Sequence, residues 1–265
     1  MGVNRKPIII NATVIFTSAA IFLSLLYQVS RYIAAFLLGV KPLVLFHNSL
    51  SYPTIGLSDK RLVFIALSGP LVSLFAGFFC HFLCLEQQNR SLGFLFKLFL
   101  SGLGYTVFFG YLIISPFFSA GNKEIVTSIL GFPLPITAIL SVLCASSLFL
   151  IIRNLMQFFV EMGTTAIADS RLLRAKLISS VLLFPVLLGV LFTTLLSFPV
   201  QTSLGLLAPV LAPLALLCAY NTVLLKRYPF DMMNRDMTVL ETISIRWIIV
   251  FGLLIVINRI LVFGI

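Results

Sequence analysis

The chain has 265 residues, of which 60% are hydrophobic and only 10% charged, and its mean hydropathy is +1.13. Soluble globular domains carry roughly 45–50% apolar and roughly 25% charged residues, so this composition excludes a domain of that class. The net charge of +10 comes from basic residues scattered along the loops, which is typical of membrane proteins and not of nucleic-acid binding. We therefore expect a polytopic membrane protein whose first partner is the lipid bilayer, with no nucleic-acid partner.

Seven apolar segments follow one another along the chain, and most are long enough to cross roughly 30 Å of hydrocarbon. They cover residues 8–40, 62–85, 92–119, 129–158, 177–198, 203–225 and 244–264. The first is too long for one perpendicular crossing, so it tilts or continues beyond the hydrocarbon. The fourth contains Pro133 and Pro135 near its start, residues that suit the first turn of a helix. The predicted fold is all-α, with six to seven transmembrane helices.

Two strongly basic loops, within residues 31–61 and 153–176, constrain the topology. If both lie on the cytoplasmic side, an even number of crossings must separate them, whereas three apolar segments lie between them. One of the three then has to be re-entrant or cross twice, and the third segment, which contains Lys97 and several glycines, is the candidate. The topology between residues 86 and 152 stays open at this point.

Motifs that carry chemistry are scarce in this sequence. The four cysteines lie in or beside apolar runs and form no C-x-x-C pair, which predicts neither a disulfide framework nor a thiolate metal site. His47 and His81 fall at opposite ends of the second apolar segment, too far apart to share a metal ion. The sequence contains no phosphate-binding loop, Rossmann glycine run or nucleophile elbow. We therefore expect no cofactor and no bound metal.

Three short motifs, taken in order and spacing, are similar to those of a known membrane scaffold. They are AAFLLGV at residues 34–40, LSGPLVS at residues 67–73, and an Asn-Leu step at Asn154 followed nine residues later by Gly163. Together they resemble the site-2 protease family of intramembrane zinc metalloproteases. The resemblance implies a site-2-protease-like core in residues 1–165 and additional transmembrane helices in residues 166–265. It also implies structural roles for Gly69, Pro70, Asn154 and Gly163.

The reactive positions of that family are replaced in this chain. The resemblance places Tyr27 and Arg31 at the two zinc-binding histidines, Gln28 at the catalytic glutamate and Met162 at the third ligand, an aspartate. A catalytic zinc site needs three N, O or S ligands and an open position for water, and an amide cannot take a proton from that water. The resemblance thus implies a pseudoprotease with a degenerate metal site and no catalytic residue. Taken singly, Tyr27 is also typical of an interfacial anchor, Arg31 of a snorkelling cation and Met162 of core packing.

Two further hypotheses concern the polar residues near this degenerate site. Charge inside a membrane is costly, so Arg31 and Glu161 are predicted to pair across the former metal cavity, the alternative being two separate interfacial charges. His47 is typical first of a histidine satisfied at the membrane interface. The alternative is that the loop at His47 and Asn48 faces the cavity, where the resemblance implies binding of an extended peptide by edge pairing.

The leading functional expectation is a non-catalytic pseudoprotease that acts as a scaffold, regulator or subunit of a membrane complex. Its expected partners are other membrane proteins or a transmembrane or extended peptide segment. The first alternative is a transporter or channel component, with a path lined by Lys97, Arg31, Glu161 and Arg259. The second is an active intramembrane metalloprotease with an atypical site. Because no organelle transit peptide is visible, the expected location is a bacterial cytoplasmic membrane.

Overall fold

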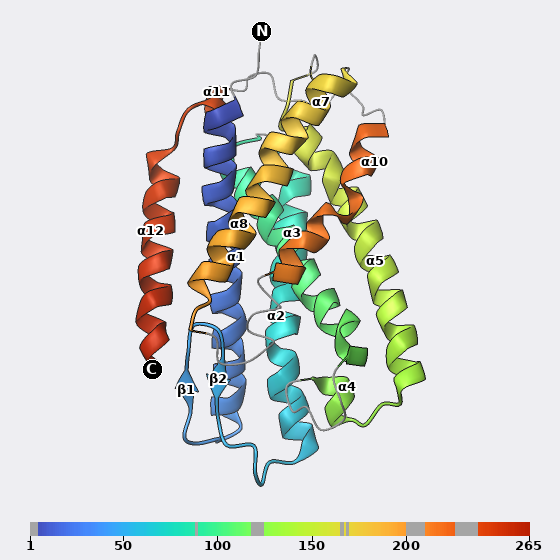
Figure 1. Cartoon of the computed structure of the whole chain (residues 1–265). Coiled ribbons are helices and arrows are strands. Elements are labelled where there is room, and N and C mark those ends of the chain that lie inside the picture. The colour runs from blue at the N-terminus through green and yellow to red at the C-terminus, as the bar shows by residue number, and fades with distance from the viewer. Residues whose placement is uncertain are drawn as a thin grey trace.

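A computed structural model describes residues 5–87, 90–117, 125–164, 167, 170–199, 210–225 and 238–265, without the side chains of residues 223–225 and 238–239. The described chain is an all-α bundle of long helices that run side by side, with one two-stranded hairpin at one end (Figure 1). Six of its helices are long and apolar enough to cross a membrane. The protein is therefore an integral membrane protein of the helical class, as its composition predicts.

The six long helices follow the predicted apolar segments closely. The first four are α1 (Arg5–Leu37), α2 (Asp59–Glu86), α3 (Leu92–Ile113) with the 3₁₀ turn Ser115–Phe117, and α5 (Leu134–Val160). The fifth is one continuous helix made of α7 (Arg171–Ile178), a π-helical turn (Ser179–Leu183) and α8 (Phe184–Leu196). The sixth is α12 (Ile245–Ile260) with the 3₁₀ turn Leu261–Phe263. The shorter elements are α4 (Val126–Ile129), α11 (Thr238–Glu241), and an apolar helix Val210–Thr222 that passes through the 3₁₀ turn Leu216–Ala219 into α10 (Tyr220–Leu225). The predicted segment 203–225 is thus a short helix in its described part, and residues 203–209 lie outside the described residues.

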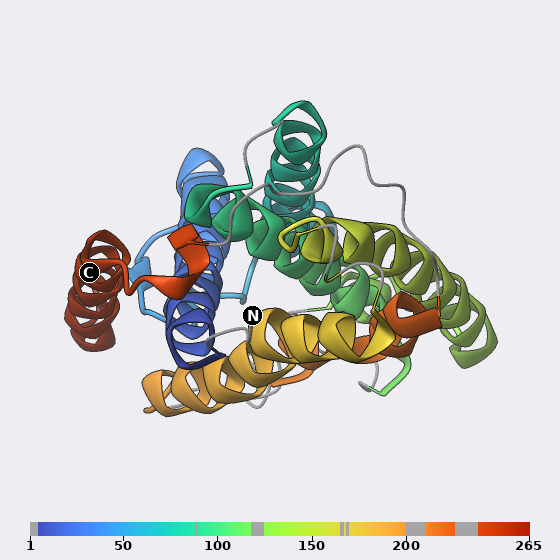
Figure 2. The same ribbon diagram turned by 90° about the horizontal axis from the view of Figure 1, so that it is seen from above.

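Helix α1 contacts most of the other long helices. It packs against α2, α3, α8 and α12, and Figure 2 shows α12 standing on the outer side of α1, away from the other helices. The 33 residues of α1 give a length of about 50 Å at 1.5 Å per residue. This exceeds the roughly 30 Å of hydrocarbon, so α1 either tilts or extends past it, as its length in the sequence predicts.

Helices α2 and α3 approach each other most closely at a pair of glycines. A Cβ atom on Gly104 would lie 2.5 Å from the carbonyl oxygen of Ser73 and 2.7 Å from the Cα of Gly77. Both are backbone atoms, so only glycine permits this approach, in the way that small residues bring membrane helices together. The glycines of the third apolar segment therefore serve packing within one continuous helix.

The two basic loops lie at opposite ends of the bundle. Helices α2, α3 and α5 lie between them in the chain, and Figure 1 shows the hairpin at one end of the bundle and α7 at the other. The assumption that both loops share one side of the membrane is therefore wrong. Three crossings separate the loops without conflict, so a re-entrant third segment is not required.

The helices after residue 165 pack onto the same core as those before it. A π-helical turn ends just before Phe184 and Pro185. Proline lacks the N–H that a regular α-helix would use in a hydrogen bond, and its ring would clash with the preceding turn of such a helix. Helix α8 then lies flat on α1, where a Cβ on Gly189 would come 2.1 Å from the Phe16 ring. Residues 1–165 and 166–265 accordingly share one hydrophobic core.

A small antiparallel hairpin follows α1, formed by β1 (Val44–Leu45) and β2 (Leu50–Ser51). One edge of it is occupied by the end of the chain. The Leu45 N–H donates to the Ile265 carbonyl at 2.8 Å, and the Ile265 N–H donates back to the Leu45 carbonyl at 3.1 Å. The N–H of His47 donates to the Leu261 carbonyl at 3.1 Å, so α12 is tied to the hairpin at this end.

Candidate functional site

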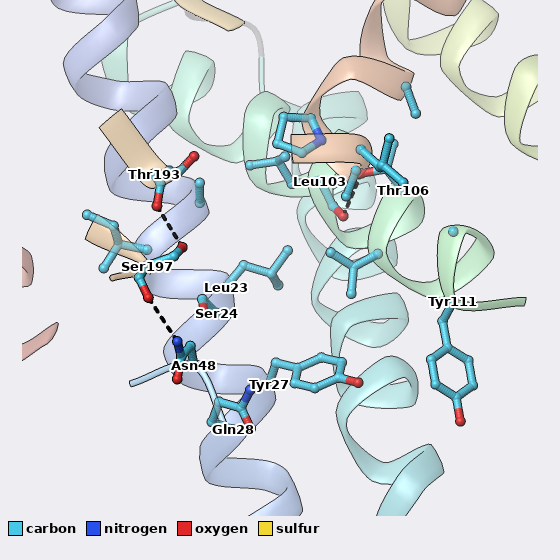
Figure 3. A pocket seen from close by; sticks show the side chains of 18 of the residues that line it. Leu23, Ser24, Tyr27, Gln28, Asn48, Leu103, Thr106, Tyr111, Thr193 and Ser197 are labelled. Carbon is cyan, nitrogen blue, oxygen red and sulfur yellow. Dashed lines mark hydrogen bonds between the residues drawn. The ribbon is translucent and has the colours of Figure 1, made fainter. Parts of the chain in front are cut away.

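A cavity of about 410 Å³ lies between α1, α3, α8 and the hairpin (Figure 3). This volume is in the range of about 300–1,000 Å³ that small-molecule sites occupy. Apolar side chains from five helices form much of its wall, among them Ile21, Leu23, Leu103, Val107, Leu148, Leu196 and Leu211. Polar side chains gather in one part of it, including Gln28, Arg31, His47, Asn48 and Asn258. The cavity is thus amphipathic.

Three of the four positions that the resemblance singles out, Tyr27, Gln28 and Arg31, line this cavity. Figure 3 shows Tyr27 and Gln28 on the same stretch of α1. A Cβ on Gly69 would come 2.7 Å from the Tyr27 ring, so that ring packs flat on the glycine of α2, next to the buried Pro70. The Gly-Pro step of α2 and the position at Tyr27 on α1 therefore meet in space.

Met162 lies elsewhere, so the predicted four-residue metal site is not assembled. Met162 is buried in the main core, close to Phe159, whose ring packs on Phe99, which in turn packs on Phe16. The end of α5 therefore lies at the level of Phe16, and the eleven residues from there to Tyr27 correspond to about 16 Å along α1. The wall near Tyr27 is formed instead by the last turn of α3.

The predicted ion pair between Arg31 and Glu161 is also wrong. Glu161 pairs with Arg90, whose Nη2 lies 2.5 Å from Glu161 Oε2, and the two side chains are 3% and 12% exposed. The Arg90 guanidinium lies 4.3 Å from the centre of the Phe94 ring and also donates to the Gln87 carbonyl. Burial raises the pKa of the Glu161 carboxyl, and the neighbouring Arg90 partly opposes this rise. This pair joins the α2–α3 connection to the end of α5.

The loop at His47 and Asn48 lines the cavity. The His47 Nε2 lies 3.1 Å from the Ser197 carbonyl, and the Asn48 Nδ2 donates to that carbonyl at 2.9 Å and to the Pro199 carbonyl at 3.1 Å (Figure 3). The neighbouring hairpin edge is already paired with Ile265. Edge pairing with an extended peptide, as the resemblance implied, would therefore have to displace that residue.

Several buried acceptors that line the cavity lack a hydrogen-bond partner within the described chain. They are Gln28 Oε1, His47 Nδ1, Asn48 Oδ1 and Asn258 Oδ1. Buried polar atoms are almost always paired with protein, water or ligand. Their gathering in one cavity provides acceptors there for ordered water or for a polar group of a ligand.

The remaining predicted residues are distributed around the bundle. Gly163 is buried where α5 meets α7, and a Cβ there would come 2.6 Å from a Leu177 methyl. Asn154 was predicted to be structural but is exposed on α5. Lys97 donates to Gln87 and Arg259 to the Phe198 carbonyl, and neither residue is among those that line the cavity. The predicted transport path is therefore not brought together.

Among the described residues, no three His, Cys, Asp or Glu side chains lie close enough together to hold a metal ion. The four cysteines are free thiols. Comparison with protein-family models, curated proteins and solved structures finds no match to this chain. The chemistry of the cavity is therefore argued from its own residues.

Sequence reasoning missed two residues that matter at these sites. Arg90 lies in a short connection, and its partner Glu161 is 71 residues away, so no local pattern links them. Asn258 is the one buried residue of α12. An amide inside a long apolar run is an available signal for Asn258, because polar groups within membrane helices usually face protein or a cavity.

Acidification should destabilise the protein through His47. Burial lowers the pKa of His47 below its ordinary value of 6.5, the Ser197 carbonyl opposes this, and the charge on Arg259 adds to the lowering. The unfolded chain therefore binds the proton first, so the stabilising contribution is complete above pH 6.5 and is lost as the pH falls below it. His47→Gln keeps a donor for the carbonyl and does not titrate.

The measurement is thermal unfolding in detergent between about pH 7.5 and about pH 5, the window in which a histidine changes charge. The unfolding temperature of the His47→Gln variant should fall less across this window than that of the wild type. Equal falls for both proteins would assign the acid sensitivity to another group.

Proposed function

We propose that this chain is a non-catalytic membrane protein, a pseudoprotease-like scaffold or regulatory subunit whose central cavity holds a ligand without cutting it. The observation that carries the proposal is the residue set at the cavity. Tyr27, Gln28 and Arg31 line it together, and no acidic side chain is among the described residues around them. Hydrolysis by the mechanism of the resembled family needs a general base beside a metal-activated water, and a neutral amide at position 28 cannot supply that base.

The resemblance to the site-2 protease family supports this proposal through its first two motifs. A long first helix, a hairpin and a second helix with a Gly-Pro step follow one another, and Gly69 packs on the Tyr27 ring. The displaced position of Met162 speaks against a working third ligand. Partners in such a role would be other membrane proteins of one complex.

The charge distribution supports one orientation in a bacterial cytoplasmic membrane. Basic residues lie at both ends of the bundle, with Lys41, Lys60 and Arg61 at the hairpin end. A larger set lies at the α7 end, beside the start of α1, and includes Arg5, Lys6, Arg171, Arg174 and Lys176. Lys and Arg accumulate in cytoplasmic loops, so the α7 end would face the cytoplasm and the hairpin and cavity would lie toward the opposite side.

A cleavage assay in liposomes tests the proposal. The protein is reconstituted with a fluorescent transmembrane peptide, with and without added zinc. Because Gln28 cannot act as a base, the wild type and the Gln28→Leu variant should both release product at the rate of protein-free liposomes. Zinc-dependent turnover by the wild type that Gln28→Leu abolishes would overturn the proposal.

A further inference from the structure

The polar part of the cavity presents acceptors, and hydrogen-bonding partners fix two of them in place. A carbonyl oxygen only accepts, so the His47 Nε2 bound to Ser197 carries the proton. In the neutral ring, the unpartnered Nδ1 is then an acceptor. The Asn48 Nδ2 is likewise held by two carbonyls, which leaves its Oδ1 as the group without a partner.

Two more acceptors come from helices on the same cavity. Gln28 and Asn258 are 7% and 5% exposed, and the side-chain oxygen of each lacks a partner in the described chain. Leaving a buried acceptor without a partner destabilises the protein. The four acceptors together therefore favour an occupant that brings several hydrogen-bond donors.

The charge of the residues that line the cavity decides which kind of hydrogen-bonding group fits there. An ammonium group would supply donors, but Arg31 lines the same cavity and no carboxylate among the described lining residues would balance a second cation. A carboxylate or phosphate would be attracted by Arg31 but would place its acceptors against four others. Hydroxyl groups donate and accept without charge, so they fit both the acceptors and the arginine.

The rest of the cavity is hydrocarbon-like. Leu103, Val107, Leu148 and Leu211 line it, and its volume of about 410 Å³ is that of a small-molecule site. A transmembrane helix is about 10–12 Å wide and about 30 Å long, far larger than this space. The geometry therefore points to a single-chain amphiphile and not to a bound helix.

We propose that the cavity binds an uncharged, hydroxyl-headed, single-chain amphiphile, with its hydroxyls on Gln28, His47, Asn48 and Asn258 and its chain along the apolar wall. This inference rests on the proposed function, because it names the ligand of the same non-catalytic cavity. A glycerol-headed monoacyl lipid is the simplest molecule of this class, and its two hydroxyls can donate to two of these acceptors.

Native mass spectrometry of the purified protein tests the proposal with three probes that share one C18 chain: 1-monooleoylglycerol, oleate and oleylamine. The wild type should retain one molecule of monooleoylglycerol and about tenfold less of either charged probe, a ratio that about 1.4 kcal/mol of headgroup discrimination provides. Gln28→Leu and Asn258→Leu should each lower retention of monooleoylglycerol about tenfold, since each removes a buried acceptor.

Matched variants separate headgroup recognition from the cavity itself. Asn154→Leu makes the same change on the exposed face of α5 and should leave retention unchanged, whereas Val107→Trp should abolish retention of all three probes by filling the cavity. Equal retention of the three probes by the wild type would overturn the hydroxyl headgroup while leaving a non-catalytic cavity in place. No retention of any probe would overturn the amphiphile altogether, and only zinc-dependent cleavage would overturn the proposed function.

Discussion

Replacing Arg90 with leucine is expected to destabilise the protein by about 3–5 kcal/mol, the usual cost of leaving one member of a buried ion pair without its partner. Arg90 is 3% exposed and holds Glu161 at 2.5 Å. Without the guanidinium, the Glu161 carboxylate stays in a largely dry site between α5 and the α2–α3 connection. The measurement is the free energy of unfolding in mixed micelles.

The double variant Arg90→Leu/Glu161→Leu distinguishes coupling from simple loss of packing. Removing both charges leaves no buried ion, so the double variant should be more stable than Arg90→Leu alone. Arg153→Leu on the exposed face of α5 serves as the control and should change stability by at most about 0.5 kcal/mol. If the losses of stability measured for Arg90→Leu and for Glu161→Leu simply add up in the double variant, the pair does not act as a unit.

Substituting alanine for Gly104 is expected to cost about 1–3 kcal/mol or more, as overpacking in a dense core does. The new methyl would stand 2.5 Å from the Ser73 carbonyl oxygen and 2.7 Å from the Gly77 Cα. Backbone atoms of α2 cannot move aside as a side chain could, so the two helices must separate. Unfolding in the same mixed micelles measures the effect.

Gly110 on the same helix provides the matched control. A Cβ there would meet nothing within 4 Å, so Gly110→Ala should be neutral or stabilise by up to about 1 kcal/mol through helix propensity. The two alanine variants of α3 are thus predicted to have opposite signs. A Gly104→Ala protein as stable as Gly110→Ala would contradict the close crossing of α2 and α3.

Much of the helical architecture could be predicted from the sequence, because long apolar runs have few other stable forms in a bilayer. The start of α5 after Pro133 follows from the restricted backbone of proline. The side of the membrane on which each loop lies could not be predicted. The positive-inside rule describes an overall excess of Lys and Arg in cytoplasmic loops and does not assign any single loop to a side. Lys97 suggested that the third segment is re-entrant. In the structure α3 is one continuous helix, and the Lys97 amine donates to Gln87 at 2.6 Å near the end of that helix.

The candidate site was predictable only where neighbours in sequence share a helix face. Gln28 and Arg31 are nearly one turn apart on α1, so their common cavity follows from helical periodicity. The prediction that Met162 joins these residues was wrong because it depends on the axial register between α1 and α5. That register is set by contacts such as the one between Phe99 and Phe159, which no local sequence pattern encodes. The amphipathic cavity itself arises from seven separate parts of the chain, among them those that contain Ser197 and Asn258.

The zinc content of the purified protein tests most directly whether this cavity binds without catalysing. Elemental mass spectrometry gives the number of zinc ions per chain after growth in zinc-replete medium. Because Tyr27, Gln28 and Arg31 replace the ligands and base of the resembled family, and Met162 is buried in the main core and does not line this cavity, the protein should carry far less than one zinc per chain. A stoichiometric zinc ion, lost in a Tyr27→Phe or His47→Gln variant, would contradict this and would mark the cavity as a metal centre.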